Sequence, residues 1–292
     1  MFKSDSAEWI KTTFQIKGSV VPVILVRSIC FALFGLLIST LYFYNLPVAQ
    51  PVLGNVIPSI VLALLLVFRT NTAYERFWEG RKLWAATTIT INNLIWQIWS
   101  NINTQTPQEK EKKVQVLRLL PALAIAKKLY LRQECPNQEL AKWLSPQQYE
   151  KIKDINDFPL EITYWVGHYM HEYLLGHLSV NQLSAMQSSL NNYQDAVNGC
   201  VRILRTPIPL AYSIHLKQLV VLYCLVLPFQ FVKDLGWFTG IFVGLVSFAL
   251  FGIEEIGLQI ENPFGYDYND LPLDEICLNI ESKVEEFIQN QS

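Results

Sequence analysis

About forty consecutive residues, from Ser28 to Phe68, contain no charged side chain, and Arg27 and Arg69 flank this run. One membrane-spanning helix needs about 20 predominantly apolar residues. The run therefore has room for two such helices, joined by the turn-forming residues between Asn45 and Asn55. Only 16% of the chain is charged, well below the roughly 25% of an average soluble protein. We therefore predict an integral membrane protein.

The order of apolar segments predicts an all-α membrane protein with four transmembrane helices. The first span covers about Val20 to Tyr44. The second begins near Pro51 and continues beyond Phe68 as one long helix, because apolar residues keep a helical spacing among the charges that follow. Two further apolar segments, 218–232 and 235–253, form a second hairpin, although the first of them is short for a span.

Two segments with helical periodicity, 114–130 and 161–204, lie between the hairpins and predict a helical domain. We expect five parts in chain order: a cytosolic N-terminal segment 1–19, a first transmembrane hairpin with its extended second helix 20–103, a cytosolic helical domain 104–215, a second transmembrane hairpin 216–260 and a cytosolic C-terminal segment 261–292.

The distribution of lysine and arginine predicts the orientation. The loop 45–55 contains none, whereas segments 3–17 and 69–82 are rich in them. Because basic residues collect on the cytoplasmic side, we expect both termini and the helical domain to be cytoplasmic. Residues 1–18 include acidic side chains and resemble neither a secretory signal nor a transit peptide. This favours a bacterial inner membrane, with a thylakoid membrane as the alternative.

Composition and motifs give no indication of catalysis. A net charge of −2 offers no basic surface for nucleic acid, and nucleophile, phosphate-loop and dinucleotide motifs are absent. We expect no enzyme activity and no cofactor. The five cysteines lack CxxC spacing, so we interpret them as reduced. His168, His171 and Glu172, with His177 nearby, have a spacing compatible with a metal site, but ordinary surface histidines are the simpler interpretation. His215 is expected between two elements, in a capping or hydrogen-bonding role.

One stripe of the second span changes character along its length. Ile60, Leu64 and Phe68 are spaced by four and share one helical face. The same face continues with polar and charged residues and a tryptophan, namely Asn71, Glu75, Trp78 and Lys82. From periodicity alone, the apolar part either faces lipid or a neighbouring helix, or forms stacked hydrophobic rings if several copies surround an axis. Such rings gate a pore by dewetting.

An oxygen-rich cluster follows the last apolar segment. Glu254 and Glu255 close that segment. The other members follow in sequence: Gln259, Glu261, Asn262, Asp267, Asn269 and Asp270. Calcium is bound by such oxygen ligands, but the spacing does not match the twelve-residue EF-hand loop. An ordinary helix exit has the same composition, so both interpretations stay open here.

Three separated motifs resemble the bestrophin family of ion channels, most closely its bacterial and plant thylakoid branch of voltage-dependent chloride channel-like members. They are FRTNTAYERFWEGRKLW at 68–84, TPIPLAY at 206–212 and ENPFG at 261–265. The resemblance implies a homopentamer in lipid around one central pore, with inorganic ions as its ligands. It places three bulky apolar residues in the pore neck, and the matching positions are Ile60, Leu64 and Phe68.

Around a central pore, the polar continuation of the stripe would form a vestibule beyond the neck. The candidates for it are Asn71 and Glu75, with the neighbouring Arg76. The resemblance also implies one further pore-lining position. A second, cytosolic constriction formed by one hydrophobic residue is expected on a later helix. Val180 is the candidate for it, with Leu178 and Leu183 as near neighbours.

Ion selectivity is open within the family, because animal and thylakoid bestrophins pass chloride whereas a bacterial relative passes sodium. The positive edge of the Phe68 ring favours an anion, and Arg69 or Arg76 nearby adds to this, whereas a ring of Glu75 carboxylates favours a cation. We expect an anion (chloride) channel, with a sodium or monovalent cation channel as the alternative. Animal members clasp calcium with a run of carboxylates after the NPFG motif. Only two remain here in 266–270, so we expect weak or no calcium dependence.

Overall fold

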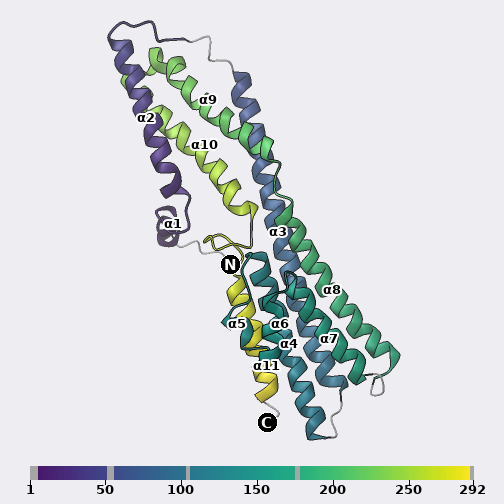
Figure 1. The fold of residues 1–292 in the computed structure, drawn as a ribbon. Helices are drawn as coiled ribbons and strands as arrows, with labels where there is room; N and C mark the ends of the chain where they lie inside the picture. The colour runs from purple at the N-terminus through teal and green to yellow at the C-terminus, as the bar shows by residue number, and fades with distance from the viewer. Residues whose placement is uncertain (1–5, 51–55, 103–105, 175–177, 290–292) are drawn as a thin grey trace. The chain divides into compact units, whose positions relative to one another are not determined.

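The computed structural model describes residues 6–50, 56–102, 106–174 and 178–289, and these residues form helices, turns and loops without a strand. Their contacts divide the chain into two compact units. The first unit comprises residues 1–77, 207–262 and 266–270, and the second comprises 78–206, 263–265 and 271–292. Helix α3, Val56–Asn101, contributes its first turns to one unit and its later turns to the other (Figure 1). The long second helix predicted from the sequence is thus confirmed as one helix.

The first unit contains the apolar helices. Among the described residues, three helical stretches are long and apolar enough to cross a membrane: Val21–Phe43, Ile57–Asn101 and Leu210–Glu261. The last consists of two helices joined by a short 3-10 turn. Besides the start of α3, the unit is built from α1 (Ser6–Thr13), α2 (Val21–Phe43), α9 (Leu210–Leu235), η2 (Gly236–Phe238) and α10 (Thr239–Glu261).

Helix α9 is longer than the sequence predicted. It begins at Leu210 instead of near residue 218 and includes the polar side chains of His215 and Lys217 in its early turns. The expectation that His215 lies between two elements is therefore wrong. The helix ends at Gly236, whose φ of 52° lies in the left-handed region that glycine adopts at no steric cost. The Ser39 hydroxyl donates to the Gly236 carbonyl at 2.9 Å and fixes this turn against α2.

Helices α2 and α10 approach closely at glycines of both helices, and the Leu36 side chain of α2 packs directly on Gly240 of α10. A Cβ added to Gly240 would lie 2.9 Å from the Ala32 carbonyl oxygen, and one added to Gly35 would lie 2.9 Å from the Gly240 Cα. Gly244 meets the Ala32 Cβ in the same way. Such small-residue contacts are the usual way in which membrane helices pack, because lipid gives no hydrophobic driving force between them.

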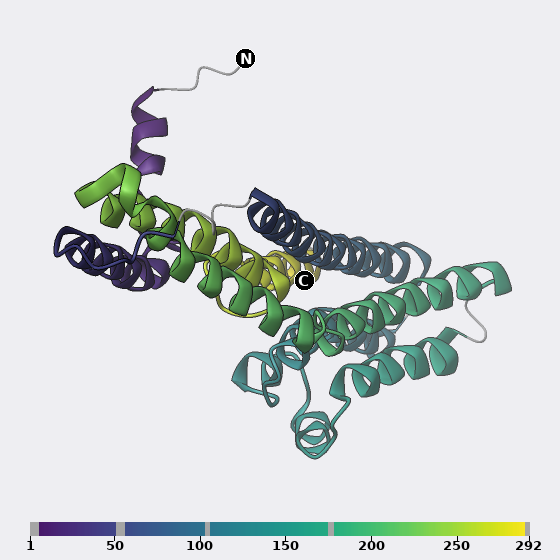
Figure 2. The same ribbon diagram turned by 90° about the horizontal axis from the view of Figure 1, so that it is seen from above.

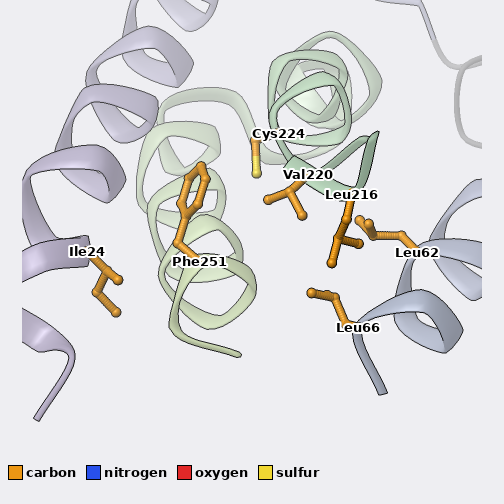
Figure 3. Packing of buried hydrophobic residues seen from close by; sticks show 7 residues of the cluster. All are labelled: Ile24, Leu62, Leu66, Leu216, Val220, Cys224 and Phe251. Atoms are coloured by element: carbon orange, nitrogen blue, oxygen red, sulfur yellow. The ribbon is translucent and has the colours of Figure 1, made fainter. Parts of the chain in front are cut away.

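An apolar cluster joins all four long helices of the first unit. Its buried members are Ile24, Leu62, Leu66, Leu216, Val220, Cys224 and Phe251. Figure 3 shows Leu62 and Leu66 of α3 facing Leu216 and Val220 of α9, while Phe251 of α10 points into the centre. The cluster therefore fixes which face of α3 is turned inward.

The second unit is a helical bundle around α4, which is buried along most of its length after residue 115. In both views α7 and α8 run side by side (Figure 1 and Figure 2). The predicted helical segment 161–204 is therefore two helices. Besides the later turns of α3, the unit contains α4 (Pro107–Leu131), α5 (Gln138–Ala141), α6 (Pro146–Lys153), α7 (Phe158–Leu174), α8 (Val180–Arg205) and α11 (Leu273–Gln289).

Two adjacent lysines of α4 are buried in this bundle. The Lys128 ammonium is held by Glu139 at 2.7 Å and by Asp274 at 2.8 Å. Arg132 also contacts Asp274, and together these hydrogen bonds lower the pKa of the Asp274 carboxyl to about 2. No carboxylate of the described residues forms an ion pair with Lys127. Its ammonium donates to the Thr87 hydroxyl at 2.6 Å, and burial lowers its pKa.

Candidate functional site

Within the first unit, α3 has one buried face and one exposed face. Leu62 and Leu66 are buried in the apolar cluster. Ile60, Leu64 and Phe68, which share the opposite side of the helix, are 61%, 53% and 55% exposed in the isolated chain. The packing of the buried face thus sets the orientation of the helix. In this orientation the side chains of Ile60, Leu64 and Phe68 can contact lipid, a neighbouring subunit or a pore.

The exposed face becomes polar after Phe68. Asn71 and Glu75 are exposed, whereas Arg76 is half-buried and its Nε donates to the Glu261 carbonyl oxygen at 3.1 Å. In the second unit, the next residues of the stripe, Trp78 and Lys82, are exposed as well. Each of these residues therefore lies on the surface of the isolated chain except Arg76, which contacts the end of α10.

Arg69 is only 2% exposed and lies on the buried face of α3. Its guanidinium donates to the Glu261 carboxylate at 2.7 Å and to the Ser213 hydroxyl at 3.1 Å. The ion pair neutralises the cation. The expectation that Arg69 attracts anions beside Phe68 is therefore wrong, because Arg69 points about 100° away from Phe68, is buried and is paired with Glu261.

Glu261 connects the three sequence motifs. One carboxylate oxygen accepts from Arg69 in the first motif, and the other accepts from the backbone N–H of Ile208 in the second motif at 2.8 Å. Glu261 itself opens the third motif. Nearby, the Tyr212 hydroxyl donates to the Leu65 carbonyl at 2.7 Å and adds a second link between α9 and α3. The motifs therefore fix α3 to the adjoining ends of α9 and α10.

The remainder of the third motif packs within the second unit. A Cβ added to Gly80 would lie 2.9 Å from the Pro263 ring and 3.1 Å from the Phe264 ring, and Phe264 is fully buried. Gly80 is therefore required by this close approach. The glycine of the first motif and the Pro-Phe pair of the third are complementary in shape.

The oxygen-rich cluster forms a turn closed by its own side chains. The Asp270 carboxylate accepts from the Asp267 backbone N–H at 2.7 Å. The Asn269 amide donates to the Gly18 carbonyl at 3.2 Å and to the Gln259 side chain at 3.0 Å. Among the described residues, no group of three or more histidine, cysteine or carboxylate side chains is placed to hold a metal ion. Asn262, Asp267 and Asp270 remain candidates from sequence only.

The candidates for the second constriction lie at the start of α8. Val180 is the first residue of this helix and is exposed, while Leu178 and Leu183 are half-buried. Ser179 caps the helix and forms a reciprocal capping box with Gln182, which fixes the position of Val180.

The histidines of α7 do not form a metal site in the part of the chain that is described. His168 is 3.4 Å from Glu172 and stacks on the Tyr164 ring, and His171 is exposed. His177 lies outside the described residues. All five cysteines are free, in agreement with the prediction that they are reduced.

Reasoning from the sequence missed the roles of Ser213 and Glu261. Ser213 carries no local signal, because a serine in an early turn of a helix is common. The sequence placed Glu261 in the oxygen-rich cluster and in the third motif but did not predict its pairing with Arg69. One signal could have predicted the pair. The uncharged run ends directly before Arg69, and an arginine buried at the end of such a run needs a carboxylate partner.

Three comparisons with known proteins agree with one another. A family model described as bacterial/fungal bestrophin protein matches residues 1–286. A voltage-dependent anion channel-forming protein of Nostoc sp. is 54% identical over 95% of this chain and 91% of its own length. One of the same description from Synechocystis sp. is 45% identical over 96% and 92%. A crystal structure of a bacterial bestrophin homolog from Klebsiella pneumoniae superimposes with a TM-score of 0.81 at 25% identity, covering 92% of this chain and 98% of the other.

Proposed function

Because this chain belongs to the bestrophin family, we propose that it forms an anion-conducting channel whose neck is lined by Ile60, Leu64 and Phe68. The observation that carries the proposal is the pair of faces on α3. Its buried face is fixed by the apolar cluster and by Arg69, so Ile60, Leu64 and Phe68, which are exposed together with Ile57, Val61 and Val67, have a defined direction. Around a shared axis, copies of this face would form stacked hydrophobic rings.

The proposed assembly is a homopentamer in which each subunit spans the membrane four times. The helices α2 and α9, the first part of α3 and α10 are the four spans, and α9 and α10 form the second hairpin. Segments 104–215 and 261–292 and the N-terminus would be cytosolic, as the distribution of basic residues indicates. The proposed location is the bacterial inner membrane or, in a photosynthetic cell, the thylakoid membrane.

Rings of isoleucine, leucine and phenylalanine cannot replace the hydration shell of an ion. They form a barrier whose height depends on the width of the neck and on whether water fills it. Asn71, Glu75 and Arg76 would line the vestibule beyond this barrier, and Val180, flanked by Leu178 and Leu183, would form the cytosolic constriction. In this mechanism the neck controls conduction, and the polar vestibule influences which ion reaches it.

Anion selectivity is supported by the names of the Nostoc and Synechocystis relatives, which are described as anion channel-forming. The exposed Glu75 carboxylate favours the alternative, a sodium or monovalent cation channel. Arg69 does not offset this negative charge, because its own charge is neutralised by Glu261. Reversal potentials of the purified channel in asymmetric sodium chloride test the sign directly. We expect the potential to move toward the chloride equilibrium potential. A potential at that of sodium would establish the alternative.

We also propose that opening does not require calcium. The Asp270 carboxylate and the Gly18 carbonyl, oxygens of the kind that calcium needs, are engaged in hydrogen bonds within the chain. Fewer carboxylates also lower the affinity for calcium. Channel currents recorded with micromolar free calcium and with excess chelator should be equal. Currents that disappear with chelator would contradict this proposal and leave the pore proposal intact.

A further inference from the structure

A groove on the surface of the first unit combines an apolar wall with two cations, Arg27 and Lys217, and the carboxylate of Glu254. It lies between α2 and α9, has a volume of about 410 Å³ and is lined on its apolar side by Val26, Cys30, Phe31, Val220, Val221 and Phe251. Val220 and Phe251 belong to the apolar cluster, as Figure 3 shows, and form the inner wall of the groove. The Phe31 ring lies 5.5 Å from that of Phe251 and makes this wall aromatic.

The charged end of the groove is built from two ion pairs. The Arg27 guanidinium lies 3.1 Å from the Glu255 carboxylate, and the Lys217 ammonium lies 3.8 Å from that of Glu254. Both carboxylates are buried, whereas the side chains of Arg27 and Lys217 are 47% and 53% exposed. The cations therefore form the outer layer, and a molecule that enters the groove meets them before it meets the carboxylates.

Both cations keep N–H donors for a ligand. Within the described residues, Lys217 has no acceptor at hydrogen-bonding distance, because 3.8 Å is too long, and Arg27 uses one nitrogen for Glu255. A guanidinium carries five N–H donors and an ammonium three. A phosphate between them could accept from both.

The depth of the two cations fits a lipid headgroup. Arg27 lies six residues after the start of α2, and Lys217 lies seven residues after the start of α9. At 1.5 Å per residue, each is about 10 Å from the end of its helix. Both helices begin on the side proposed to be cytosolic, where anionic lipids attract basic side chains.

We propose that this groove binds one anionic phospholipid per subunit, with its phosphate on Arg27 and Lys217 and an acyl chain along Phe31, Val221 and Phe251. The proposal rests on the placement of the first unit in a bilayer. It does not depend on which ion the protein conducts. A bound lipid of this kind would connect α2 to α9.

The test measures lipid binding to the intact, purified oligomer by native mass spectrometry. Phosphatidylglycerol and phosphatidylcholine with identical acyl chains are compared. We expect one phosphatidylglycerol per subunit, bound at least about fivefold more tightly than phosphatidylcholine, because one basic residue near a membrane surface contributes about 1 kcal/mol. Glycerophosphoglycerol, the same headgroup without chains, and inorganic phosphate should not displace the lipid at equal concentration. Displacement by either would assign the site to a free phosphate and overturn the proposal.

Three variants separate the contributions. Lys217→Gln should weaken phosphatidylglycerol binding about fivefold. Arg27→Gln combined with Glu255→Gln should do the same without leaving a buried carboxylate unpaired. Cys30→Trp fills the apolar half, keeps all four charges and should weaken both lipids. Lys233→Gln, an exposed lysine at the other end of α9, is the matched control and should change nothing.

Equal affinity for the two lipids would overturn the proposal, as would binding that neither Lys217→Gln nor Cys30→Trp weakens. An intact oligomer that retains no lipid, because a second copy of the chain covers the groove, would also overturn it. None of these measurements uses ion conduction, so their failure is distinguishable from failure of the channel proposal.

Discussion

The Arg69 guanidinium donates to the Glu261 carboxylate at 2.7 Å, and this pair connects α3 to the end of α10 across 192 residues of sequence. Because Arg69 follows Phe68 directly, the pair fixes the rotation of α3 at the level of the proposed neck. A buried arginine is costly unless it is paired and hydrogen-bonded, and here Ser213 supplies the additional bond.

Replacing Arg69 by leucine should destabilise the protein by about 3 kcal/mol, because it leaves Glu261 largely buried without its cation. Thermal unfolding of the purified protein in detergent measures this. Arg81→Leu, an exposed arginine on the same helix, is the control and should change the free energy of unfolding by less than about 0.5 kcal/mol. If the two variants unfold alike, the pair has no role in holding α3.

Replacing Ile60, Leu64 and Phe68 together by alanine should raise the single-channel conductance, because a wider neck lowers the barrier to water and ions. Planar-bilayer recording of the purified channel gives the measurement. Leu33→Ala with Leu37→Ala removes two exposed apolar side chains of α2 and serves as the control. An unchanged current in the triple variant would reject the neck.

Acid should weaken the second unit through Asp274. Its pKa is lowered from the usual 3.8 to about 2, so its contribution to stability is complete above about pH 4 and is lost as the pH falls toward 2. Tryptophan fluorescence during unfolding between pH 5 and pH 2 follows this loss. Asp274→Asn should flatten the dependence, whereas Asp154→Asn, at the exposed end of α6, should retain it. A steep dependence that persists in Asp274→Asn would assign the effect to other carboxylates.

Gly240→Ala should destabilise the contact between α2 and α10 by roughly 1–3 kcal/mol, because the added Cβ would lie 2.5 Å from the Leu36 side chain and 2.9 Å from the Ala32 backbone oxygen, which cannot move aside. Gly252→Ala, on the same helix, is the matched control because its Cβ meets only the Ile24 side chain at 3.4 Å. Unfolding temperatures of both variants provide the comparison. Similar values would mean that α2 and α10 separate easily enough to admit the methyl group.

The positions of α2 and α3 were predictable because a long run without charges has few alternatives to membrane-spanning helices. The start of α9 could not be predicted in the same way, because His215 and Lys217 indicated that a polar segment continued up to residue 217. In the structure Lys217 is accommodated inside the helix by its ion pair with Glu254. Periodicity identified the faces of α3 but could not say which one is buried. That depends on Leu216, Val220 and Glu261, which lie far away in sequence.

The same limit applied to Arg69 and to the buried lysines of α4. A charged residue predicts exposure unless a partner is known, and the partners of Arg69 and Lys128 come from other helices. The start of α8 was also missed: the sequence reasoning treated 161–204 as one helical segment, although Ser179 and Gln182 form the capping box that begins α8.

The tight fit at Gly240 has a mechanical consequence. Two helices whose backbones are in contact cannot slide or rotate past each other without a steric clash, so α2 and α10 should move together as one rigid body. The interface between α3 and α9, in contrast, consists of aliphatic side chains that can change rotamer, Leu62 and Leu66 against Leu216 and Val220. A small rotation of α3 about its axis would widen the proposed pore at Leu64. Rotamer changes at the interface with α9 would accommodate this rotation, while α2 and α10 stay in place.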